Sequence, residues 1–215
     1  MELNLNYTKE LKNLGISYLG NYSQSTKMRL SEENGVITYC IYLAPADMSG
    51  YNVCPCSTFC RKFCLNGSGH NKADILVRGE ESRINIGRIK RTRLFFENHT
   101  LFMKLLIHEI IKTRKYAEKK NLGFAVRLNG TSDLSPEQFV YNGKNILEIF
   151  PDVQFYDYTK VYSRLPLIAK YKNYDLTFSY NGHNELSCKR FLEAGGKVAV
   201  VFANQEMLPM KFMGY

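Results

Sequence analysis

The chain has 215 residues and a mass of 24.8 kDa, the size of one large domain or two small ones. Its 45% hydrophobic and 23% charged residues are ordinary for a globular protein and exclude wholesale disorder. The 29 basic and 20 acidic residues leave a net charge of +9, which is compatible with a polyanionic partner. The chain lacks an apolar run of the roughly 20 residues that a membrane span needs, and residues 1–4 lack a secretory signal, so we expect a cytoplasmic protein with no membrane partner.

The first half of the chain contains three stretches of different character. Residues 1–34 are polar, and we predict a peripheral lead-in. Residues 35–43 form a β-branched and aromatic run after Asn34, which predicts a strand. Residues 44–75 follow as a cysteine-rich loop. From residue 82 to 120 the composition becomes helical, with apolar positions at helical spacing.

In the second half, strand and helix signals alternate about every 25 residues. This alternation predicts βα units and a mostly parallel sheet. Five or six such units within one α/β domain over residues 1–215 favour an incomplete TIM-like barrel, and an open doubly wound sheet is the alternative. The predicted strands are 124–128, 153–158, 175–180 and 198–202, and the predicted helices are 135–150 (with a break near Asn142-Gly143), 163–171 and 184–194.

Polar residues follow each predicted strand, at the carboxyl edge where parallel α/β sheets place their chemistry. At this edge we predict acid–base or ligand-binding roles for Asp133, Asp157 and Lys160. A helix-capping role for Asp133 is the alternative. The predicted cofactor-binding side chains are those of Asn129, Ser132, Ser179 and Asn181, and a further polar turn is Asn204-Gln205-Glu206.

Four of the six cysteines fall within eleven residues, as Cys54, Cys56, Cys60 and Cys64. In a reducing compartment, clustered cysteines more often bind metal or carry out redox chemistry than form disulfides. We therefore predict a metal site in the 44–75 loop. The plainer interpretation is that the thiols are small buried hydrophobic groups.

The spacing of these cysteines favours an iron–sulfur cluster, and a 4Fe-4S cluster in particular, over zinc. Structural zinc usually takes two short cysteine pairs that are separated by a longer stretch, and the two remaining cysteines here, Cys40 and Cys188, are isolated. A compact run of three or four cysteines can wrap one cluster. Zinc remains the alternative.

Several motifs resemble those of the phage "gene product eighty-eight" family. They are Cys54-Pro55 with Cys60-Arg61-Lys62-Phe63-Cys64, the strand and turn Arg127–Asp133, the segment Pro151–Lys160, and the strand end Leu176–Ser179. The resemblance covers roughly residues 40–208. Cys56 is an extra cysteine relative to the family pattern.

A cluster loop directly after the first strand of a βα array is also the layout of radical S-adenosylmethionine proteins, which the family loosely resembles. That resemblance implies reductive cleavage of S-adenosylmethionine as the first reaction to test, on an unidentified substrate. The usual Cys-x₃-Cys-x₂-Cys loop of those enzymes is not present.

A second function, from a different class, is a zinc-stabilised nucleic-acid-binding protein. Residues 78–120 hold twelve Lys and Arg against five Glu. Arg83, Lys90 and Arg91 lie at near-helical spacing, as a phosphate-binding stripe requires. A solvated helix face explains the same pattern.

Overall fold

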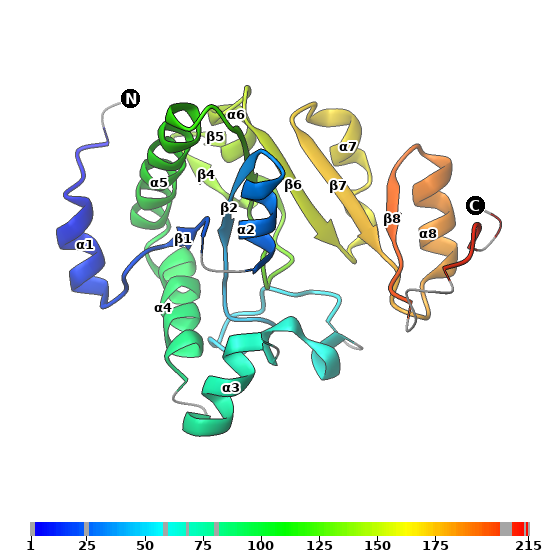
Figure 1. The fold of residues 1–215 in the computed structure, drawn as a ribbon, viewed down its shortest axis with the longest axis horizontal. Helices are drawn as coiled ribbons and strands as arrows, with labels where there is room; N and C mark the ends of the chain where they lie inside the picture. Colours follow the sequence, from blue (N-terminus) through cyan, green and yellow to red (C-terminus); the bar gives the residue numbers. More distant parts are fainter. Residues whose placement is uncertain are drawn as a thin grey trace.

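The computed structural model describes residues 3–23, 26–57, 60–67, 69–79, 82–202, 208–212 and 214. In this part of the chain six strands form one sheet, and β1 is antiparallel to its neighbour while the following pairs are parallel (Figure 1). The strands, in their spatial order, are β1 (Gly20–Asn21), β2 (Val36–Ile41), β3 (Gly123–Arg127), β6 (Gln154–Thr159), β7 (Tyr174–Ser179) and β8 (Lys197–Ala199).

Two long helices, α4 (Arg83–Glu97) and α5 (His99–Lys119), lie in the connection between β2 and β3. The Ser82 side chain accepts the Asn85 N–H at 3.3 Å and caps α4. The Asn98 side chain accepts the Leu101 N–H at 3.2 Å and caps α5. The Asn98 cap divides the predicted helical region 82–120 into two helices.

The prediction of a helix over 135–150 was wrong for most of that range. A 3₁₀ turn, η4 (Pro136–Gln138), leads into a small hairpin of β4 (Val140–Tyr141) and β5 (Lys144–Asn145). Asn142 and Gly143 join the two strands with φ of 50° and 77°, because an Asn-Gly pair readily adopts the positive φ values of a tight hairpin turn. Only α6 (Ile146–Ile149) is helical.

The strand order of the sheet follows the chain order without reversal. The parallel pairs confirm the predicted mostly parallel α/β sheet. A doubly wound sheet would instead reverse its strand order at a switch point. The sheet is open, with β1 and β8 at its edges, so it forms no closed barrel and the TIM-like features are not confirmed. The later crossovers contain η5 (Tyr162–Arg164), α7 (Pro166–Lys170) and α8 (Glu185–Glu193).

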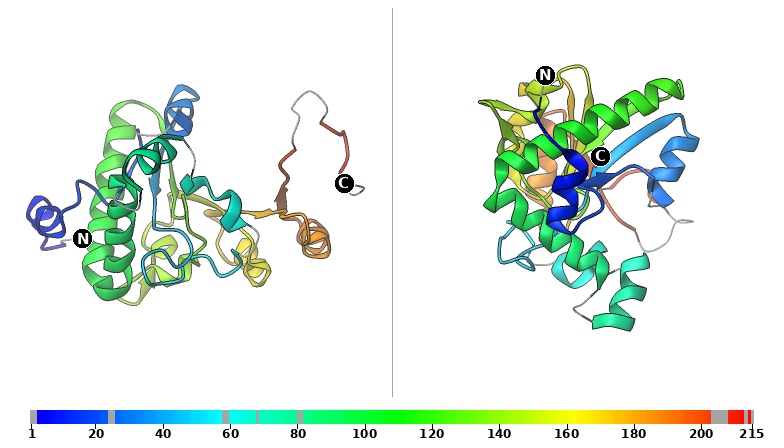
Figure 2. Two further views of the ribbon diagram at one scale, coloured as in Figure 1. Left: turned by 90° about the horizontal axis from the view of Figure 1, so that it is seen from below. Right: turned by 90° about the vertical axis from the view of Figure 1, so that its left-hand side faces the viewer.

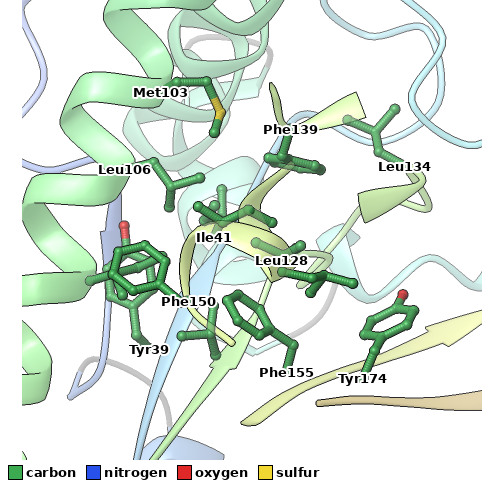
Figure 3. Close-up of a cluster of buried hydrophobic side chains, with 14 of the residues drawn as sticks. Tyr39, Ile41, Met103, Leu106, Leu128, Leu134, Phe139, Phe150, Phe155 and Tyr174 are labelled. Atoms are coloured by element: carbon green, nitrogen blue, oxygen red, sulfur yellow. The ribbon is translucent and has the colours of Figure 1, made fainter. Parts of the chain in front are cut away.

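The hydrophobic core lies between α5 and one face of the sheet (Figure 3). Tyr39, Val126 and Phe155 are neighbours across β2, β3 and β6, and each is at most 1% exposed. Met103 and Leu106 of α5 are fully buried against this face. Further along the same face, Phe191 of α8 stacks on Phe178 of β7 at 5.0 Å.

The amino-terminal segment, which we predicted to be a peripheral lead-in, contributes to the sheet and the core. It contains α1 (Tyr7–Leu14), β1 and α2 (Thr26–Glu33). Leu19 is fully buried, and Gly20 pairs with Ile41. The polar composition of this segment does not reveal its role, because a few apolar residues such as Leu19 are enough to attach it to the core.

The second face of the sheet is covered only in part by the described helices. α2 lies on this face against β2, where the Ser31 and Thr38 hydroxyls are 3.0 Å apart. In Figure 2 (left), α2 and the pair α7 and α8 lie on opposite sides of the sheet. Burial alternates along β6 and β7, as expected for strands with one open face.

Among the described helices, none is both long and apolar enough to cross a membrane.

Candidate metal and ligand site at the carboxyl edge of the sheet

The cysteine loop begins where β2 ends, at the carboxyl edge of the parallel strands. Val53 anchors its start, because the Val53 N–H donates to the Ala46 carbonyl at 2.9 Å and the Val53 carbonyl accepts the Asp133 N–H at 2.8 Å. Two 3₁₀ turns, η1 (Cys60–Phe63) and η2 (Leu65–Gly67), form its later part. The helix α3 (Gly69–Arg78) follows.

Three thiols of the loop are half-buried and occupy one electrostatic environment. Burial raises the pKa of Cys54 to about 11, and the charges of Asp133, Cys60 and Cys64 raise it further. The fourth thiol, Cys56, is exposed. Cys56 therefore differs from the other three predicted ligands in its exposure to solvent.

Each of these three sulfurs has a polar neighbour. Cys54 Sγ donates to the Thr131 carbonyl at 3.8 Å, and Cys60 Sγ donates to the Ser57 carbonyl at 3.6 Å. Cys64 Sγ instead accepts the Asn66 N–H at 3.5 Å. The soft thiol donors suit iron–sulfur clusters or zinc, but within the described residues no three His, Cys, Asp or Glu side chains are arranged as metal ligands.

A buried amide network holds the end of the cysteine loop against α3 and α4. The Asn66 and Asn71 side chains each donate to Asn85 Oδ1 at 3.0 Å, and Ser82 Oγ donates to Asn71 Oδ1 at 2.9 Å. All four side chains are at most 6% exposed. A buried network in which every group is hydrogen-bonded favours one geometry. Here the network fixes the position of Asn66, two residues after Cys64.

Arg88 connects this network to the end of β2. Its guanidinium donates to Asn66 Oδ1 and lies 5.4 Å from the centre of the Tyr42 ring. Burial and the nearby Arg91 charge lower the pKa of Arg88, whereas Cys64 raises it. In the described chain no carboxylate forms an ion pair with Arg88.

The turn after β3 is held by Asp157 of β6. The Asp157 carboxylate accepts the Asn129 N–H at 2.8 Å and the Asn129 side chain at 3.0 Å. Asn129 Oδ1 in turn accepts Ser132 Oγ at 2.8 Å. Burial raises the pKa of Asp157 to about 7, against the lowering effects of Arg127 and these hydrogen bonds. Asp157 lies 2% exposed on the helix-covered face, where its contacts hold the turn.

Asp133 holds the turn after β6 in a similar way. Its carboxylate accepts Thr159 Oγ1 at 2.8 Å and the Lys160 N–H at 3.0 Å, and it forms an ion pair with the buried Arg164. The N-cap of η4 is Ser135 and not Asp133, and an acid–base role for Asp133 stays a prediction. Asp133 joins two neighbouring strand ends.

The structure therefore joins five of the seven predicted residues of this edge in neighbouring networks. Asn129, Ser132 and Asp157 form one, and Asp133 with the Lys160 backbone forms the next. The other two predicted residues, Ser179 and Asn181, bond locally to Asn184 in the turn before α8. The predicted turn Asn204–Glu206 lies outside the described residues.

The comparison with known protein families agrees with the motifs in the cysteine loop and the strand ends. The sequence pattern of the family described as Gene product 88 matches residues 8–213. The chain belongs to this family. No curated protein and no solved structure matches it. For this member of the Gene product 88 family, the resemblance to radical S-adenosylmethionine proteins stays a prediction.

The three basic residues predicted as a phosphate stripe have different environments in this family member. Arg91 is 8% exposed and donates to the Tyr18 and Tyr42 carbonyls at 3.2 and 3.1 Å. Lys90 is exposed and donates to the Gly15 carbonyl at 3.0 Å. Arg83 is exposed at the start of α4. A phosphate would therefore reach Arg83 and Lys90 more easily than Arg91.

The sequence alone predicts no individual role for Arg88, Asn66 or Arg127. Arg127 ends β3, donates to the Asn129 carbonyl at 3.1 Å and lies 5.1 Å from the centre of the Tyr158 ring. A charged residue within an otherwise apolar strand segment is the signal that could have identified it. For Asn66 the sequence offers no comparable signal, because its neighbours resemble those of any polar loop.

Proposed function

We propose that the cysteine loop binds a metal centre through Cys54, Cys60 and Cys64, and that this centre is an iron–sulfur cluster. The observation that carries the proposal is the half-buried Arg88 guanidinium, which donates to Asn66 near Cys64 and has no carboxylate partner among the described ion pairs. Thiolates bound to a metal would supply the missing negative charge.

Burying a charge without a partner is unfavourable, and full burial of an uncompensated ion costs several kcal/mol. The half-buried Arg88 carries part of this cost. In the described part of the chain, the Arg88 guanidinium contacts the Asn66 amide oxygen and the Tyr42 ring, neither of which carries a negative charge. Ionised thiolates would balance Arg88, and Arg88 would in turn stabilise the thiolates.

The hydrogen bond from the Asn66 N–H to Cys64 Sγ supports the same proposal. Backbone hydrogen bonds to ligand sulfurs are among the means by which proteins set the potential of an iron–sulfur centre. When bound, such a cluster supplies electron transfer. The residues of this chain would hold it, shield it from water and supply positive charge.

The isolated cysteines argue for a cluster rather than a closed zinc site. Cys40 is fully buried within β2, and Cys188 is 2% exposed in α8, so neither provides a fourth ligand. Structural zinc sites have four protein ligands. Three thiols leave a fourth position for exposed Cys56 or a small molecule, and S-adenosylmethionine is the small molecule to test first.

The test is anaerobic purification followed by elemental analysis and ultraviolet–visible spectroscopy. We expect iron and acid-labile sulfide with broad visible absorption. The variants Cys54→Ser, Cys60→Ser and Cys64→Ser should each lose most of the iron, whereas the matched variant Cys188→Ser should retain it. Colourless protein that contains zinc but no iron would reject the cluster, and protein without any metal would reject the metal centre.

A further inference from the structure

The open face of the sheet is the largest feature that the proposed metal centre does not explain. Parallel sheets usually have both faces covered, because helical crossovers lie over them. Here the strand order is sequential, so successive crossovers place α7 and α8 on the same side (Figure 2). Figure 1 looks onto the other face, where α2 lies over β2 and no described helix lies in front of β6 and β7.

The side chains on this open face are aromatic and polar rather than aliphatic. Tyr156 and Tyr158 of β6 both point to it, and Tyr158 is 43% exposed. Residues two apart on a strand share a face and lie roughly 7 Å apart. Thr177 of the neighbouring β7 is half-buried on the same face. The face therefore does not resemble the apolar surface of an obligate dimer.

Positive charge accompanies these rings. The Arg127 guanidinium lies over Tyr158 and forms no ion pair in the described chain. The nearby Asp157 carboxylate is on the opposite face and bonds to Asn129. At the other end of the strands, Lys197 and Asp175 pair and cancel. Arg127 therefore adds positive charge to this face, and the whole chain has a net charge of +9.

We infer that this face binds single-stranded nucleic acid, with bases stacked on Tyr158 and Tyr156 and a phosphate contacted by Arg127. Sheet faces with exposed aromatic rings are a recurrent platform for unpaired bases, and arginine adds both charge and a flat stacking surface. Since every base has a flat face, this surface would be tolerant of sequence.

The shape of the face favours a polymer over a small ligand. Small molecules bind in concave sites that enclose most of their surface. Two cavities of the described structure, of about 270 and 240 Å³, lie elsewhere: one is at the amino end of β7 beside Gly195, and the other is between α8 and Phe212. An extended strand can instead lie along an open sheet.

The test is fluorescence anisotropy with a labelled oligothymidylate of about 16 nucleotides, titrated with the metal-loaded protein at several salt concentrations. Tyr158→Ala should weaken binding roughly 5- to 100-fold, because stacking on one ring is lost. Arg127→Gln should weaken binding and reduce the slope of log affinity against log salt by about 0.7. Tyr158→Phe should bind as the unmodified protein does.

Two matched controls lie away from the face. Tyr162 is 37% exposed but packs edge-on against Phe178 on the helix-covered side, so Tyr162→Ala should not change binding. Arg83→Gln on α4 should also leave it unchanged. Thermal melting of each variant distinguishes weakened binding from unfolding. Because the Tyr158 side chain is exposed, we expect its variants to fold.

Three results would overturn the inference. The first is absence of binding at low salt. The second is binding that depends on Arg83 and Lys90 but not on Tyr158, which would assign the interface to α4. The third is thymidine monophosphate binding as tightly as the oligonucleotide, which would indicate a nucleotide site instead. A Cys60→Ser protein that lacks metal but still binds the oligonucleotide would separate this inference from the proposed metal centre.

Discussion

Glu109 of α5 joins the amino-terminal segment to the core through a single buried carboxylate. It accepts the Tyr7 and Tyr39 hydroxyls at 2.5 and 2.6 Å and the Leu19 and Gly20 N–H groups at 2.8 Å. Four donors converge on two oxygens, so the charge is well compensated. Hydrogen bonds to charged groups are worth about 1.5–3 kcal/mol each.

We expect Glu109→Gln to lower the free energy of unfolding by about 2–4 kcal/mol. The NH₂ group of glutamine would replace one carboxylate oxygen, and it cannot accept the hydrogen bonds that this oxygen receives. Urea denaturation measures this change. Glu118→Gln on the same helix is the control: Glu118 is exposed and pairs with Arg114, so its loss should cost less than about 1 kcal/mol. Equal effects of the two variants would contradict the assigned role of Glu109.

Asp157 gives a pH dependence of stability. Its pKa is raised by burial from 3.8 to about 7, so between these pH values the folded state binds more protons than the unfolded state. The free energy of unfolding should therefore fall as the pH rises from about 4 to 7, by up to roughly 4 kcal/mol from this group.

Denaturation midpoints across this pH range measure the effect. Asp157→Asn cannot titrate, so the difference in stability between the unmodified protein and this variant should shrink as the pH rises. A difference that stays constant from pH 4 to 7 would show that the carboxyl group is ionised throughout, held by the Asn129 hydrogen bonds.

At the scale of elements, the end of β2 and the turn after β3 approach each other closely at Gly130. A Cβ atom there would lie 2.7 Å from both the Ile41 carbonyl oxygen and the Tyr42 ring. Gly130 N–H donates to the same carbonyl at 2.9 Å. A side chain would force these two segments apart, just where the cysteine loop begins.

Gly130→Ala should therefore destabilise the protein by about 1–3 kcal/mol. It should also reduce metal content if the proposed centre is correct, since the turn anchors the start of the cysteine loop. Gly67→Ala is the control, because nothing lies within 4 Å of its added Cβ. Thermal melting and metal analysis of the two variants make the comparison, and a stable Gly130→Ala protein would contradict the packing argument.

The sequence predicted strands better than it predicted helices and turns. Strands at 36–41 and 154–159 lie within one or two residues of their predicted ranges, because both stretches are rich in the β-branched and aromatic residues that favour strands. The hairpin around Asn142-Gly143 was missed because the spacing of the neighbouring apolar residues is also typical of a helix. α3 was missed because its Gly, Asn and charged residues resemble a loop.

The candidate site was predictable in location but not in detail. The carboxyl-edge rule correctly grouped Asn129, Ser132 and Asp157, since topology alone places strand ends together. The pairing of Asp133 with Arg164 was not predictable, because it depends on how far the turn after β6 folds back. The placement of Arg88 against Asn66 likewise depends on tertiary packing across 22 positions of sequence.

At the scale of the whole molecule, the amino-terminal segment closes one edge of the sheet. A protein that lacks residues 1–23 would lose β1 and three of the four residues that donate to Glu109. We expect a clearly lower urea midpoint and a tendency to associate through the exposed edge of β2. Light scattering and denaturation test this, and a protein that lacks only residues 1–2, which precede the core-packed Leu3 and Leu5, should behave as the full chain does.

The two ends of the cysteine loop are fastened to different parts of the fold. The start is bonded to the turn after β3 through Val53, and the end is bonded to α4 through Asn66. A metal bound by the cysteines of this loop would then link the helical layer to the strands. Chelation should make the Arg61 peptide bond markedly more sensitive to trypsin, and the rate of that cut would report occupancy without any spectroscopic signal.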